Sequence, residues 1–369
     1  RLPAKKIMAA QTIAPVLLRE EDEDFSDKKI RCAGCGGKIA GDILSQVLAG
    51  LEIHQRADQL SGLETPDDAA IIDPAGQRLA QSVDQLRSML DDPYVFAQIA
   101  ANHALSDLYA MGAEPQSAMA LITLPYAADR IQRRELAQLM HGCVDTLNQA
   151  GCTLSGGHTS EGAELGLGFV VNGLLTTAGA LHKDGLRDGD LLILSKPLGS
   201  GVLLAADMQA RAKGTDIQAC IKQMQQSNRV AADIFKQYKT SAMTDITGFG
   251  LLGHLLEMLS ASDVSCELEV EKIPLMSGAL ELSRQGIRST LFPKNLRFAE
   301  TSIDAGHWRK VSAHELLFDP QTSGGLLAGI SETDSPDCLA ALQQAGYSAA
   351  TVIGKVTTCK KPASRINIA

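Results

Sequence analysis

The stretch Gly248-Phe249-Gly250-Leu251-Leu252-Gly253 matches the pattern G-x-G-x-x-G, and its surroundings decide the fold class. In a dinucleotide-binding fold this pattern follows an apolar strand and opens a helix. The preceding residues, 240–245, make a poor strand because small and polar side chains interrupt the apolar run. A doubly wound nucleotide-binding sheet is therefore disfavoured. The glycines still predict a turn that enters a helix over 251–259, whose free N–H groups would face an anion or orient Asp245.

Outside this stretch, the apolar pattern predicts a mixture of helices and short strands. Helices are expected at 93–112 and 130–151, where apolar residues recur at helical spacing and Gly112 would end the first helix. Strands are expected at 69–73, 80–84, 117–124, 166–175, 191–194, 325–329 and 349–356. Because helices and strands do not alternate strictly, the prediction is an α+β pair of domains.

The bulk composition indicates a soluble globular protein of two domains. The chain has 369 residues, 45% hydrophobic and 21% charged, with a net charge of −9. That charge gives no basic field for nucleic acid, and no apolar run is long enough to span a membrane. Six scattered cysteines predict buried free thiols and hence a reducing, cytoplasmic location. We predict a tether at 1–30, an N-terminal domain at 31–182 and a C-terminal domain at 183–369.

Aspartates next to small or apolar residues are the first candidates for chemistry. They are Asp67, Asp68, Asp84, Asp107 and Asp245. A carboxylate in apolar surroundings costs energy unless something pairs with it, and Mg²⁺ prefers oxygen ligands. Two interpretations stay open: the aspartates gather around cations that neutralise a triphosphate, or each one caps a helix or turn.

Cys32 and Cys35 form a C-x-x-C pair in a glycine-rich segment that also contains Lys38. Zinc is disfavoured because no second pair of ligands has the required spacing. The alternatives are a redox disulfide or a mobile, exposed thiol. Lys38 would then favour the thiolate form of Cys35 and contact phosphate.

Two polar, glycine-rich segments have ambiguous roles. Residues 156–161 read either as a loop that holds phosphate with backbone N–H groups or as a plain connection. Residues 319–325 read in the same way either as a phosphate-holding loop or as a turn before the strand at 325–329.

The motifs together resemble those of the selenophosphate synthetases. Residues 34–39 resemble the N-terminal reactive loop of that family. Further motifs follow in the family's order along the chain, namely 67–70, 105–112, 156–158, 244–254 and 319–325. The similarity extends from about residue 31 to the C-terminus, and the ordered set is far more specific than any one motif.

The resemblance implies the fold of aminoimidazole ribonucleotide synthetase. Each subunit would contain two α/β domains, and the N-terminal sheets of a homodimer would pair into a β-barrel. ATP would bind in the dimer-facing cleft with Mg²⁺, and K⁺ is a further cofactor considered. Residues carried over by motif are the metal ligands Asp68, Asp107 and Asp245, the acidic position Asp84, the reactive Cys35, the essential Lys38, and the phosphate-side residues Gly156, Gly157 and His158.

The family reaction converts ATP, selenide and water into selenophosphate, AMP and phosphate. The alternatives are another ATP-dependent enzyme of the superfamily or a nucleotide-binding module without turnover. His103 departs from the family pattern, because an asparagine is usual at that position, and Cys32 would allow a disulfide with Cys35. Residues 1–30, which lack a starting methionine, resemble the junction of domains fused behind a pyridine-nucleotide-disulfide oxidoreductase.

Overall fold

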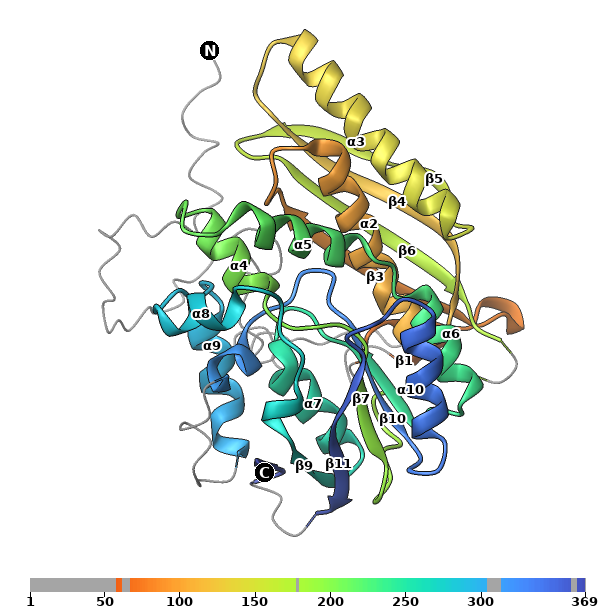
Figure 1. Cartoon of the computed structure of the whole chain (residues 1–369). Helices are drawn as coiled ribbons and strands as arrows, with labels where there is room; N and C mark the ends of the chain where they lie inside the picture. The colour runs from red at the N-terminus through yellow and green to blue at the C-terminus, as the bar shows by residue number, and fades with distance from the viewer. Residues whose placement is uncertain (1–57, 62–66, 177–178, 304–312, 360–363, 369) are drawn as a thin grey trace, which may run out of the picture. The chain divides into compact units, whose positions relative to one another are not determined.

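Two sheets with their helices make up the described part of the chain. The structure, a computed structural model, describes residues 58–61, 67–176, 179–303, 313–359 and 364–368. One sheet is built from the N-terminal half and the other from the C-terminal half (Figure 1). The expected tether at 1–30, Cys35 and Lys38 lie outside the described residues.

The N-terminal sheet has six strands in the order β1-β2-β3-β6-β4-β5. Neighbouring strands are antiparallel except β4 and β5, which are parallel and joined through helix α3. Side chains alternate between a face covered by α2 and α3 and an outer face (Figure 1). The bounds are β1 Gln59–Ser61, β2 Ala70–Ile72, β3 Leu79–Arg87, α2 Pro93–Ala110, β4 Glu114–Pro125, α3 Asp129–Gln149, β5 Thr153–Gly162 and β6 Gly166–Leu174.

Helix α2 is buried on nearly all sides because it packs against α3, the N-terminal sheet and strand β8 of the C-terminal sheet. Its start is well defined: Asp92 Oδ1 accepts hydrogen bonds from the backbone N–H groups of Tyr94 and Val95, and Pro93 occupies the first turn. Its end is followed by Gly112 at φ 70°, the left-handed position that glycine adopts without strain. This helix therefore holds Asp107 at a fixed place between the two sheets.

The C-terminal sheet has six strands in the order β12-β9-β11-β7-β10-β8, antiparallel except for β12 and β9. Helices α7 and α10 pack close to it, and α4, α5 and α8 form a further apolar cluster. The bounds are β7 Leu191–Leu194, α4 Ser200–Asp207, α5 Gly214–Gln225, α6 Arg229–Gln237, β8 Ala242–Asp245, α7 Gly250–Ala261, β9 Val264–Leu268, α8 Ala279–Arg284, α9 Phe292–Ala299, β10 Leu326–Ile330, α10 Ser335–Gln344, β11 Thr351–Thr358 and β12 Ile366–Ile368.

The structure corrects two expectations from the sequence. Residues 240–245 contain a true strand, β8, whose four residues are all buried, and it pairs antiparallel with β10. Residues 156–161, expected as a loop, belong to the edge strand β5. The α+β class, the helices α2, α3 and α7 and the other expected strands are confirmed within one or a few residues of their bounds.

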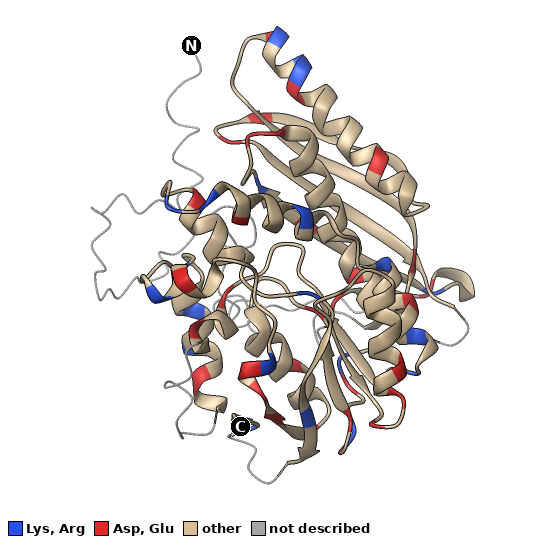
Figure 2. Cartoon of the chain, in the orientation of Figure 1, with Lys and Arg blue, Asp and Glu red and all other residues tan. Residues whose placement is uncertain are grey.

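The remaining composition-based expectations concern cysteines and charge. Of the six scattered cysteines, five are buried free thiols and Cys359 is a half-buried one. Lys and Arg are spread over several elements, α3 and α5 among them, and are interleaved with Asp and Glu (Figure 2). Within the described residues, no helix combines the length and the hydropathy that crossing a membrane would require.

Candidate active site

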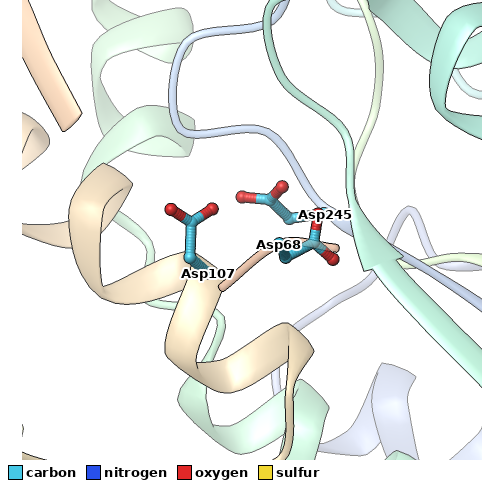
Figure 3. Close-up of side chains that lie close together, drawn as sticks. All are labelled: Asp68, Asp107 and Asp245. Atoms are coloured by element: carbon cyan, nitrogen blue, oxygen red, sulfur yellow. The ribbon is translucent and has the colours of Figure 1, made fainter. Parts of the chain in front are cut away.

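Three aspartates from distant parts of the chain meet between the two sheets. Asp68 lies just before β2, Asp107 on α2, and Asp245 is the last residue of β8 (Figure 3). One carboxylate oxygen from each lies within 4.8 Å of the others. The sequence prediction that these three side chains gather in one place is therefore confirmed as geometry.

Hydrogen bonds orient two of the three carboxylates. Ser82 Oγ on β3 donates to Asp107 Oδ2 at 2.5 Å, and Thr244 Oγ1 donates to Asp68 Oδ1 at 3.0 Å. The second oxygen of Asp68 and the Oδ2 atom of Asp245 are buried, and neither has a hydrogen-bond partner among the residues that the structure describes. Buried carboxylate oxygens rarely stay unpaired unless an ion or water satisfies them. The donor set of three carboxylates is also the kind that a hard divalent cation prefers.

The carboxylates raise each other's pKa in the absence of a cation. The pKa of Asp68 is raised to about 7: burial is the main cause, Asp245 and Asp67 add to the rise, and the nearby Lys183 opposes it. Burial, together with Asp84 and Asp245, raises the pKa of Asp107 well above its ordinary value. Like charges this close are stable only when protons or cations neutralise them. The residues therefore fit a divalent-cation site.

A buried lysine that the sequence did not point to, Lys183, also contacts Asp68. Lys183 Nζ is 3.0 Å from Asp68 Oδ1 and 3.0 Å from Glu257 Oε2 on α7. Burial alone would lower the pKa of Lys183, but Asp68 and Glu257 together raise it. Burial would raise the pKa of Glu257, yet His254 and Lys183 lower it to about 2. His254 and Glu257 lie three residues apart on one helix, a spacing from which their contact could have been predicted. The contact between Lys183 and Glu257 could not have been predicted from sequence spacing.

Asp84 lies beside the cluster, and a buried histidine contacts it. His103 Nε2 on α2 is 3.3 Å from Asp84 Oδ2 on β3. The backbone N–H of Ser323 donates to His103 Nδ1 at 3.4 Å, so Nδ1 accepts and the ring proton is on Nε2, facing Asp84. His103 thus connects Asp84 with the segment 319–325.

Segment 319–325 forms a buried turn before β10, as expected. Its Gln321 Oε1 accepts hydrogen bonds from the backbone N–H groups of Gly199 and Ser200 at the start of α4. Lys196 Nζ donates to the backbone carbonyls of Gln226 and Ser323, and burial lowers the pKa of Lys196 to about 7. These bonds hold the turn against Lys196 and the start of α4.

Gly156, Gly157 and His158 do not join the three aspartates in the structure. They lie on β5, and β6 and β4 separate this strand from β3. Across the sheet, His158 pairs with Leu121, and the same row of paired residues continues to Gln85 on β3, so these side chains point to one face. Asp84 precedes Gln85 on the strand and therefore points to the opposite face. Gly157 is required locally, because a Cβ there would lie 2.1 Å from the carbonyl oxygen of Ala120. Its contribution to nucleotide binding stays a prediction, as do the roles of Cys35 and Lys38.

Family models match most of the chain. Residues 66–175 match the AIR synthase related protein N-terminal domain, and residues 187–367 match the C-terminal domain. The expected domain boundary at 182/183 falls between these matches and stays a prediction.

Curated relatives and solved structures agree with these models. Selenide, water dikinase of Clostridioides difficile is 36% identical over 325 residues, covering 88% of this chain and 92% of the relative. That of Pelobacter propionicus is 38% identical over 339 residues, covering 91% and 96%. A thiamine-monophosphate kinase from Stenotrophomonas maltophilia has a TM-score of 0.61 at 22% identity, covering 89% of this chain and 94% of its own. The hydrogenase maturation protein HypE in complex with ATP has a TM-score of 0.61 at 17% identity, covering 88% and 87%. These structures share the fold.

Proposed function

The chain belongs to the selenide, water dikinase family of the AIR synthase-related proteins, and from this premise we propose that it makes selenophosphate. The reaction consumes ATP, selenide and water and releases AMP and phosphate. The observation that carries the proposal is the convergence of Asp68, Asp107 and Asp245, two of which have a buried carboxylate oxygen that no described residue hydrogen-bonds. A phosphotransferase needs such a site, because its substrate is a polyanion.

Mg²⁺ is the cation that the donor set fits, with Asp68, Asp107 and Asp245 as ligands and Asp84 as a neighbouring carboxylate. When bound, Mg²⁺ would neutralise the nucleotide phosphates and the charge that develops as a phosphate is transferred. The residues themselves supply orientation. Ser82 and Thr244 hold one oxygen each of Asp107 and Asp68 before any ligand binds, so little reorganisation is needed at the moment of reaction.

We assign the handling of selenium to two residues in the segment before residue 58. We propose that Cys35 captures or delivers selenium and that Lys38 neutralises charge on the nucleotide phosphates or on the selenium nucleophile. A thiolate is the reactive form of cysteine, and a nearby ammonium favours it. A fused oxidoreductase upstream and a cytoplasmic location are further expectations from the sequence.

The outer face of the N-terminal sheet supports the proposal of a homodimer. Val83 and Met119 are 59% and 47% exposed, and both pair with Val170 in one row across that face. Apolar side chains gathered on an open sheet face are typical of an interaction surface. A second copy packed there would cover β5 and give Gly156, Gly157 and His158 the intersubunit position that the β-barrel dimer requires.

The direct test is ³¹P NMR of ATP, selenide and Mg²⁺ with the purified protein. We expect a selenophosphate signal together with AMP, dependent on selenide. Asp245→Asn should lower the rate by at least about 100-fold, whereas Asp263→Asn, which changes an exposed aspartate paired with Arg365, should not. ATP hydrolysis that ignores selenide would instead favour another enzyme of the superfamily, and ATP binding without turnover would favour a binding module.

Potassium enters the same assay as a separate variable. Replacing K⁺ by tetramethylammonium at constant ionic strength tests whether the wild-type enzyme needs a free monovalent cation. A loss of turnover would support the K⁺ expectation, and unchanged turnover would remove K⁺ from the cofactors.

A further inference from the structure

The segment that connects the two sheets also contacts the aspartate cluster. His182 Nδ1 lies 2.9 Å from Asp67 Oδ2, and the backbone N–H of Lys183 donates to the same oxygen at 3.4 Å. On its other side, the backbone N–H of Met243 on β8 donates to the carbonyl of His182. The segment thus lies between the Asp67–Asp68 turn and β8, the two elements that supply Asp68 and Asp245.

Lys183 places a buried ammonium group within this arrangement. Its side chain is 11% exposed, and Nζ is 3.0 Å from both Asp68 Oδ1 and Glu257 Oε2. Thr244 Oγ1 donates to the same oxygen of Asp68. Two carboxylate oxygens therefore lie against the ammonium group, and one of them is also held by the Thr244 hydroxyl. A monovalent cation such as K⁺ or NH₄⁺ would fit the same surroundings, because such an ion, like the ammonium group of lysine, is a compact single positive charge.

We propose that Lys183 is a positioning residue that provides, from within the chain, the single positive charge that a bound monovalent cation would otherwise bring to Asp68 and Glu257. By occupying Oδ1 of Asp68 it leaves Oδ2, which is buried and has no partner in the described part of the chain, for the divalent-cation site. It also connects Asp68 to α7 through Glu257. The inference rests on the proposed cation site but not on turnover.

Shortening Lys183 should turn the position into a true monovalent-cation site. Lys183→Ala removes the ammonium group and leaves its two carboxylate partners in place. We would measure the melting temperature with EDTA and without ATP, in tetramethylammonium, potassium or ammonium chloride at equal ionic strength. In tetramethylammonium the variant should melt about 5 °C or more below the wild type, because two buried carboxylates lose their partner. Potassium or ammonium should restore at least half of this difference, whereas the wild type should melt equally in all three salts.

Three control variants separate ion binding from a general salt effect. Lys183→Met fills the space with an uncharged chain of similar length and should not recover. Lys183→Ala combined with Glu257→Gln removes one carboxylate and should not recover either. Lys355→Ala removes an exposed partner of Glu332, 2.8 Å away, and should show no ion-specific shift. If Lys183→Ala does not fold in tetramethylammonium, the refolding yield in each salt replaces the melting temperature.

Equal melting temperatures or refolding yields of Lys183→Ala in all three salts would overturn the inference. So would an ammonium-specific stabilisation of the wild type as large as that of the variant. Binding of Mn²⁺, followed by electron paramagnetic resonance, gives a second readout: ammonium should raise the Mn²⁺ affinity of Lys183→Ala and leave that of the wild type unchanged. Because neither measurement needs selenide or ATP, an inactive wild type that passes them would contradict the proposed activity and not this inference.

Discussion

Ionisation of the aspartate cluster should make the metal-free protein less stable as the pH rises from 5 to 8. Burial and neighbouring carboxylates raise the pKa of Asp68 from 3.8 to about 7 in the folded protein. Between these two values the folded state binds a proton that the unfolded state has already lost. The stability contributed by this proton is complete below pH 4 and is lost as the pH rises through 7.

The size of the effect follows from the shift. At roughly 1.4 kcal/mol per pH unit, a shift of about three units corresponds to about 4 kcal/mol, of which about 3 kcal/mol falls between pH 5 and 8. Glu257 does not interfere: its pKa of about 2 is lowered, so its contribution has the opposite sign and is complete by pH 5. His182, whose pKa Asp67 raises, contributes with the same sign as Asp68, so a variant is needed to isolate the aspartate.

The assay compares thermal unfolding of the wild type and of Asp68→Asn in EDTA across this pH range. The wild type should lose several degrees of melting temperature relative to the variant as the pH rises. Saturating Mg²⁺ should restore most of the loss in the wild type only, because the ion binds the folded state. Parallel profiles for the two proteins, with or without Mg²⁺, would refute the account of a charged, buried cluster.

Three further outcomes are expected. Cys35→Ser should abolish selenophosphate formation in the ³¹P assay while leaving the melting temperature unchanged, and full activity would exclude Cys35 from the reaction. Gly157→Ala should lower the free energy of unfolding by about 3 kcal/mol or more, because the new Cβ would meet the Ala120 carbonyl. Gly156→Ala should lower it by only about 1 kcal/mol, because nothing lies within 4 Å of a Cβ there. Equal losses for the two variants would contradict the packing described for β5. Met119→Lys should shift the protein from dimer to monomer in light scattering, with Met208→Lys on another surface as its control, and an unchanged mass would argue against the sheet-face dimer.

Long periodic helices were predictable from the sequence because their own residues carry the signal. Helix α2 begins at a proline after a capping aspartate, a glycine follows its last turn, and its apolar residues recur with helical spacing. The two strands that were misread lack such a signal. In β8, Thr244 and Asp245 are polar, which hides the strand in the sequence, yet both are buried between other elements. Strand β5 is an exposed edge strand, so no alternation of apolar residues marks it.

The prediction of the aspartate cluster required information beyond the spacing of residues. Spacing alone left the aspartates open to a capping role, and only the order of the family motifs placed Asp68, Asp107 and Asp245 together. The contacts of Lys183 could not be read in this way, because its partners Asp68 and Glu257 are far from it in sequence and belong to different halves of the chain. Such pairings depend on how the two sheets pack, which local patterns do not encode.

A crystal structure with Mn²⁺ and a non-hydrolysable ATP analogue would test the central claim most directly, since manganese can be located by its anomalous scattering. We expect metal ions bonded to one oxygen each of Asp68, Asp107 and Asp245, at about 2.1 Å for a magnesium-sized ion, and to the phosphates of the analogue. Metal ions bound elsewhere, with the three carboxylates making no contact to them, would contradict the account.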